Sequence, residues 1–144
     1  MNMKLLNLSI IILIILFASA CVKKEFEFTQ PIENVEKVEV ILIGLPVIAE
    51  NRHEQTILYE LTQSEYGSAI ETILDLDSDR LYTSPATLFP DMKAFKITYK
   101  NGDYEIINNF AQGSLIKGRY KAEGYYTFDI DEFNDLIDKY INMK

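Results

Sequence analysis

Residues 95–107 of this 144-residue chain read FKITYKNGDYEII, which is the clearest β-hairpin signal in the sequence. Apolar and polar residues alternate before the turn, and Asn101-Gly102 is typical of a two-residue type I′ turn, in which both central residues take positive φ angles. Such a turn fixes the register of the two strands. The expected cross-strand pairs are Lys100 with Asp103, Tyr99 with Tyr104, and Ile97 with Ile106.

Upstream of the hairpin, the pattern predicts two strands and a helix. Residues 38–43 are apolar on both sides of an extended chain, which favours a central or covered strand, and residues 56–61 form a plausible second strand. Thr62 and Glu65 then have the spacing of a capping box, and apolar residues recur at helical intervals until about residue 76.

Downstream, residues 119–129 form another strand, and a helix follows that is capped by Asp129. The residues of this helix expected to face the sheet are Ile130, Phe133, Ile137, Tyr140 and Ile141. The fold class is therefore α+β. We expect an antiparallel sheet of about four or five strands with two helices packed on one face, in the order β-β-α-β-β-β-α.

The N-terminus has the order of a secretory signal. Residues 1–4 carry positive charge, residues 5–17 are almost unbroken Leu and Ile, and residues 18–20 are small. The apolar run has about thirteen residues, whereas spanning a bilayer takes roughly twenty, so a permanent transmembrane helix is the weaker interpretation. We assign residues 1–20 to a signal peptide.

Cys21, the only cysteine, follows directly after the small residues. This arrangement resembles the lipobox of bacterial lipoproteins, in which the signal is cut before the cysteine and the thiol carries a diacylglycerol. The resemblance implies lipid attachment at Cys21 and a location at the extracytoplasmic face of a cell membrane. A lone cysteine cannot close an intrachain disulfide, and two or three acyl chains give stable attachment.

The remaining chain divides into a short lipidated segment and one domain. Residues 21–34 mix charges with a proline, and we expect a tether with a short docking segment at its end. The thirteen residues after Cys21 reach at most about 45 Å. Residues 35–144 suit a single domain. The formal net charge of −8 becomes one unit more negative when the signal is removed, and such an acidic body argues against nucleic acid as a partner.

Signals for catalysis or a metal are weak. His53 is the only histidine, and a solvated loop position explains it better than a metal site does. The acidic run Asp75 to Asp79 begins like a calcium loop but has Arg80 where glycine is needed. Gly113 to Gly118 superficially resembles a phosphate loop, although a hairpin or connecting loop explains it. We therefore expect that the protein is not an enzyme and that it has no catalytic residue, no metal and no cofactor. Acid–base catalysis by a pair of carboxylates is the alternative that the sequence leaves open.

The resemblance extends to the C-terminal part of the chain. The F-x-I-x-Y-x-N-G hairpin, residues 118–120, residues 126–129 and the helix pattern F-x-x-L-I-x-x-Y from Phe133 to Tyr140 look like small, mostly uncharacterised lipoproteins of Firmicutes. The resemblance covers roughly the last fifty residues and the lipobox. It implies a compact α+β domain displayed outside the cell, and it carries no catalytic residue.

Binding of a ligand or partner protein is the favoured function. Residues 77–92 form an irregular stretch with two prolines and the large side chains Tyr82, Leu88 and Phe89. Long irregular segments are often functional, and the alternative is a crossover packed over the sheet. Tyr125 and Tyr126 must lie on opposite faces of their strand, so Tyr125 is a further candidate contact, with core packing as the alternative.

The sequence thus predicts a membrane-anchored, noncatalytic lipoprotein that binds a small ligand or an envelope protein. The alternative is a structural or inhibitory accessory subunit of an envelope complex, and an enzyme is less favoured.

Overall fold

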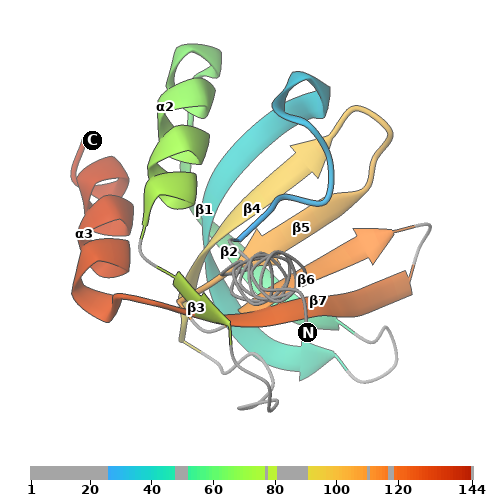
Figure 1. The fold of residues 1–144 in the computed structure, drawn as a ribbon. Helices are drawn as coiled ribbons and strands as arrows, with labels where there is room; N and C mark the ends of the chain where they lie inside the picture. Colours follow the sequence, from blue (N-terminus) through green and yellow to red (C-terminus); the bar gives the residue numbers. More distant parts are fainter. Residues whose placement is uncertain are drawn as a thin grey trace, which may run out of the picture.

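A curved antiparallel sheet carries two helices side by side on one face (Figure 1). The computed structural model describes residues 26–47, 52–76, 78–80, 91–109, 111–116 and 119–143. Within these ranges the elements are η1 (Ile32–Asn34), β1 (Val35–Val47), β2 (Arg52–Glu60), α2 (Gln63–Asp75), β3 (Ser78–Arg80), β4 (Lys93–Tyr99), β5 (Tyr104–Ile107), β6 (Ala111–Ile116), β7 (Arg119–Phe128) and α3 (Ile130–Ile141).

The expected α+β class and the order of the main elements are confirmed. In the described part of the chain the sheet has seven strands in the order β2-β1-β4-β5-β6-β7-β3, and all the pairings are antiparallel. The sequence pattern did not predict β3 or β6 as strands. β6 includes Gly113 to Ile116, so most of the stretch that superficially resembles a phosphate loop is a strand paired with both neighbours.

The main core lies between the sheet and the helices. It contains alternate residues of the central strands together with the inner faces of both helices; its largest members with almost no exposure are Phe95, Ile97, Tyr99, Ile73, Phe133, Ile137 and Tyr140. A second, smaller cluster lies on the opposite face and contains Ile41, Ile43, Ala94 and Ile106. Burial on both sides explains why residues 38–43 are apolar at every position except Glu39.

Both predicted helix caps are present. The Thr62 backbone N–H donates to the Glu65 carboxylate at 2.6 Å, and this bond is the largest cause of the lowered pKa of Glu65. The Asp129 carboxylate accepts hydrogen bonds from the backbone N–H groups of Asp131 and Glu132, each at 3.0 Å. These bonds satisfy donors that the first turn of a helix leaves without intrahelical partners.

The prediction that Ile130 of α3 faces the sheet was wrong. Ile130 is 51% exposed, whereas Leu136, which was not predicted, is buried. Helical side chains lean toward the N-terminus of their helix, so a first-turn residue such as Ile130 extends past the packed interface.

The predicted turn of the hairpin was also wrong in type and in register. Among the turn residues only Gly102 has a positive φ, of 85°, and the Tyr99 N–H donates to the Asp103 carbonyl at 2.9 Å. The loop therefore has three residues and ends on a left-handed glycine. The Asn101 side chain accepts from the Asp103 N–H at 3.0 Å, which stabilises this wider loop.

The extra loop residue shifts the strand pairing by one position. The observed pairs are Thr98 with Tyr104, Ile97 with Glu105, Lys96 with Ile106 and Phe95 with Ile107. Because side chains alternate between faces, this shift turns every β5 side chain to the face opposite the one the two-residue turn predicts. Glu105 consequently lies on the helix side of the sheet, next to Tyr99.

Gly102→Val is expected to lower the free energy of unfolding by about 1 kcal/mol or more, because a β-branched residue resists a positive φ. Gly67→Ala provides a control of opposite sign. Gly67 lies inside α2, where an added Cβ meets nothing within 4 Å, so alanine should raise stability by up to about 1 kcal/mol. Urea denaturation measures both changes, and equal stability of the valine variant and the parent would contradict the turn assignment.

Candidate functional site

Residues 26–34, which we call the docked segment, pack against the domain before the first strand begins. Phe26 is 4% exposed and its ring meets Phe28 and Phe128 edge-on, with centroids 5.1 and 5.4 Å apart. These contacts join the docked segment to the end of β7, where α3 starts. Phe26 belongs to the core, so packed structure reaches at least this far into the segment expected to be a tether, ahead of the expected domain boundary at Val35.

A buried carboxylate holds the middle of the docked segment. Glu105 has no exposed surface, and its Oε1 accepts hydrogen bonds from the Tyr99 hydroxyl and from the N–H and hydroxyl of Thr29, the latter two at 3.2 Å. Removing a carboxylate from water is costly unless several donors replace the lost solvent. The bonds from Thr29 and Tyr99 supply donors from the docked segment and from β4.

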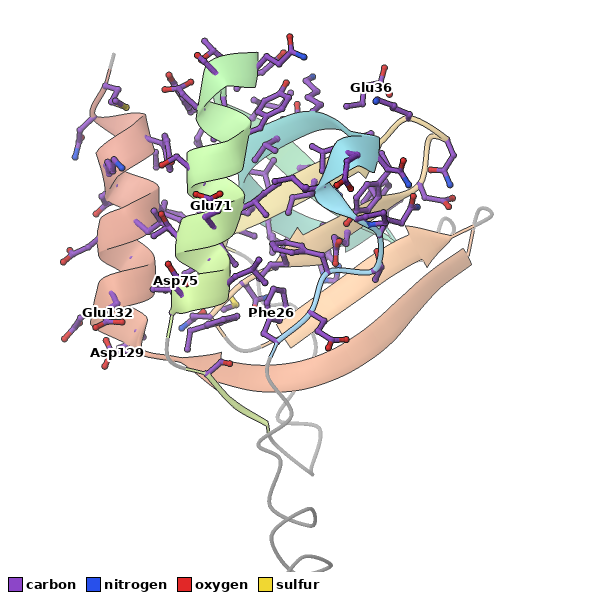
Figure 2. All side chains as sticks on the ribbon, turned by 45° about the horizontal axis from the view of Figure 1, so that its top comes forward. Phe26, Glu36, Glu71, Asp75, Asp129 and Glu132 are labelled. Carbon is purple, nitrogen blue, oxygen red and sulfur yellow. The ribbon has the colours of Figure 1, made fainter. Side chains whose placement is uncertain are left out.

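The far end of the docked segment is held by the β4–β5 hairpin. The Lys100 N–H donates to the Asn34 carbonyl at 2.9 Å, and the Lys100 ammonium donates to the Glu33 carbonyl at 2.8 Å. The docked segment is thus fixed at its start by aromatic packing, in its middle by Glu105 and at its end by Lys100. In Figure 2 Phe26 lies near the ends of the helices that carry Asp75 and Asp129, while Glu36 lies at the opposite end of the domain.

This arrangement holds residues 26–34 against the sheet, and the Glu105 carboxylate has no surface exposed to a substrate. A carboxylate without exposed surface does not meet a molecule from solution in this conformation, and its Oε1 is already engaged by donors from within the chain. The hydrogen bonds of Glu105 and Lys100 hold residues 26–34 on the sheet.

A second group of charged residues lies at the β1–β2 edge of the sheet. Lys37 contacts Glu39 at 2.9 Å and Glu60 at 3.0 Å, and hydrogen bonds to these two carboxylates raise the pKa of Lys37, Glu39 having the larger effect. Lys96 lies 4.7 Å from the centre of the Tyr104 ring. These pairs give the buried Glu39 carboxylate two cationic neighbours, Lys37 at 2.9 Å and Lys96 at 4.0 Å, which offset the cost of removing its charge from water.

Most of the residues predicted from sequence to form a site lie outside the described ranges. Cys21, Tyr82, Leu88 and Phe89 belong to this group. Tyr125 lies in β7 with its backbone opposite Ala111, and its side chain is outside what the structure describes. The register places Arg80, the last residue of β3, opposite Tyr126, the neighbour of Tyr125 in sequence.

The other polar residues singled out in the sequence lie in or next to regular elements of the fold. His53 lies in β2 opposite Pro46 and is half-buried, so the expected loop position was wrong. The acidic run also spans two elements, because Asp75 ends α2 and Ser78 begins β3. Within the described ranges, no three His, Cys, Asp or Glu residues are grouped so that they would hold a metal ion.

Sequence reasoning missed the role of Glu105. The signal was a single acidic residue within an apolar run, YEII at 104–107, together with the short alternation EFEF just before Thr29. Neither pattern indicates a contact between residues 76 positions apart.

No known protein family, curated protein or solved structure matches this chain. Over the ranges described by the structure, none of the helices combines the length and the apolar character needed to cross a bilayer.

Tyr99→Phe is expected to lower the free energy of unfolding by about 1 to 3 kcal/mol, because it removes a donor from the buried Glu105 carboxylate. Tyr104→Phe is the matched control on the other face of the sheet. It keeps the aromatic ring over which the Lys96 ammonium lies, and it should change stability by less than about 0.5 kcal/mol. Thermal unfolding compares the two variants, and equal effects would mean that the bond to Glu105 adds nothing.

Proposed function

We propose that this chain is a lipoprotein, held at the extracytoplasmic face of a cell membrane by lipid on Cys21, and that it binds a ligand or a partner protein at the envelope without catalysing a reaction. The order of charged, apolar and small residues before a single cysteine supports the anchor. Lipidation accounts for the position of Cys21, for the presence of only one cysteine and for the residues around it.

The start of the docked segment is the structural observation that carries this proposal. Every element that the structure describes begins after Cys21, and Phe26, the first described residue, is already part of the core. Cleavage just before Cys21 therefore leaves all of these elements in the mature chain. The proposed anchor also lies five residues before Phe26. Aromatic packing of Phe26 and the hydrogen bonds from Thr29 to Glu105 hold this part of the chain against the core.

The binding role is supported by the aromatic residues around the start of residues 81–90. This segment follows β3 directly, and β3 pairs with β7 so that Arg80 lies opposite Tyr126. Tyr82 follows Arg80 by two positions in sequence, Leu88 and Phe89 belong to the same stretch of sequence, and Tyr125 is the neighbour of Tyr126. Aromatic side chains dominate the energetics of many interfaces, which favours a protein or small-molecule partner for this region. An accessory role within an envelope complex is the alternative.

Cys21→Ser is expected to abolish lipid labelling and to leave uncleaved precursor, because the thiol sulfur is the attachment atom. Metabolic labelling with a fatty acid and intact mass spectrometry measure both effects in the producing cell. A mature chain that begins at another residue, or an unmodified Cys21, contradicts the proposed anchor.

Tyr82→Ala and Phe89→Ala are expected to weaken binding to a partner that the parent domain retains from envelope extract, while leaving the unfolding midpoint unchanged. Truncation of an aromatic hot spot commonly costs about 2 kcal/mol of binding energy or more. Leu45→Ala, at a described position that is 64% exposed, is the surface control. Retention of a partner from envelope extract and thermal unfolding are measured together. A loss of roughly 3 to 5 kcal/mol of stability would instead assign Phe89 to the core.

A further inference from the structure

We propose that the domain faces its membrane with one particular end, which we call the membrane-facing end and which is defined by Phe26, Asp75, Asp129 and Glu132. The occupant opposite this end is the phospholipid headgroup surface of the bilayer that holds the anchor. This inference rests on the proposed lipidation of Cys21 and adds an orientation to it.

The length of chain between the anchor and the fold sets the limit on separation. Phe26 follows Cys21 by five residues, and an extended chain covers at most about 3.6 Å per residue, so the reach is at most about 18 Å. The tether expected from sequence, which runs to Asn34, would allow about 45 Å. A flexible tether of that length would let the domain turn in any direction, whereas the shorter connection keeps Phe26 near the headgroups.

The docked segment cannot lengthen the connection without breaking contacts. Releasing it exposes Phe26, removes the Thr29 donors from Glu105 and separates Asn34 from Lys100. A carboxylate left buried with fewer donors is strongly unfavourable. The anchored position of Phe26 is therefore a property of the folded domain.

The contacts of Phe26 identify the end of the domain that is held close. Its ring meets Phe128, the last residue of β7, and Asp129 then caps α3, which places Glu132 in the first turn of that helix. Figure 2 shows Phe26 at the end of the domain with Asp75, Asp129 and Glu132, and Glu36 at the other end. Glu36 follows the far end of the docked segment, where Asn34 is bonded to Lys100.

Charge sets how the membrane-facing end approaches the bilayer. Asp75, Asp129, Asp131 and Glu132 are all exposed, so the described part of this end carries four carboxylates. Anionic headgroups repel acidic side chains over a distance of about 8 to 10 Å at physiological ionic strength. The end therefore faces the headgroups across a water layer and does not insert, while the connection to Cys21 prevents it from moving away.

Energy transfer from the domain to the membrane tests this orientation. Lipid occupies the thiol of Cys21, so a cysteine introduced elsewhere is the one that a thiol-reactive donor labels. Glu132→Cys and Glu36→Cys form a matched pair, because both replace an exposed glutamate, one at each end of the domain. The lipidated full chain is placed in vesicles of phosphatidylglycerol and phosphatidylethanolamine that contain a headgroup-labelled acceptor lipid.

The expected result is a higher transfer efficiency from position 132 than from position 36. Inserting about twelve Gly and Ser residues between Lys24 and Glu25, a linker whose own r.m.s. end-to-end distance is roughly 17 to 21 Å, should lower the efficiency at position 132 and bring the two values together. Asp131→Cys provides a second donor site if the label at position 132 lowers the unfolding midpoint.

The outcomes separate the orientation from the anchor. Intact mass spectrometry first reports whether lipid is attached, and a chain without lipid overturns the proposed anchor together with this inference. A lipidated chain with equal transfer from both positions, or with higher transfer from position 36, overturns the orientation alone. A difference between the positions that survives linker insertion unchanged also overturns it, because the short connection would then not be its cause.

Discussion

The carboxylate of Glu105 connects parts of the chain that are far apart in sequence. Its Oε1 accepts from Tyr99 in β4 and from Thr29 in the docked segment, and it does so without exposure to solvent. A buried acidic group of this kind is stable only while its donors stay in place. The position of the N-terminal segment and the packing of the central hairpin therefore depend on each other.

This arrangement follows from a turn that is one residue longer than its sequence predicts. The loop ends on Gly102 with a positive φ, and the pairing of Ile97 with Glu105 results from it. A two-residue turn would place Glu105 on the face that carries Lys96. In the observed register the helix side of β5 presents a carboxylate beside Ile107, and the docked segment covers it with hydrogen-bond donors.

The local features of the fold could be predicted because short-range physics determines them. The caps at Thr62 and Asp129, the helical spacing of Ile70 and Ile73, and the antiparallel class each follow from interactions within a few residues. Only part of the candidate site was predictable. Cys21 is recognisable from its neighbours in sequence, whereas the docking of Thr29 on Glu105 depends on a contact that no local pattern encodes.

The amino-acid sequence by itself determined the class of the fold, its helix ends and the place of its only cysteine, because periodicity, capping and composition act over short distances. Only the tertiary structure decided the hairpin register, the burial of Glu105 and the packing of Phe26 in the core. In the observed register the Asn101 bond to the Asp103 N–H and the docking of Thr29 on Glu105 favour the same hairpin. The length of chain between Cys21 and the fold depends on this packing, because residues 26–34 lie against the domain.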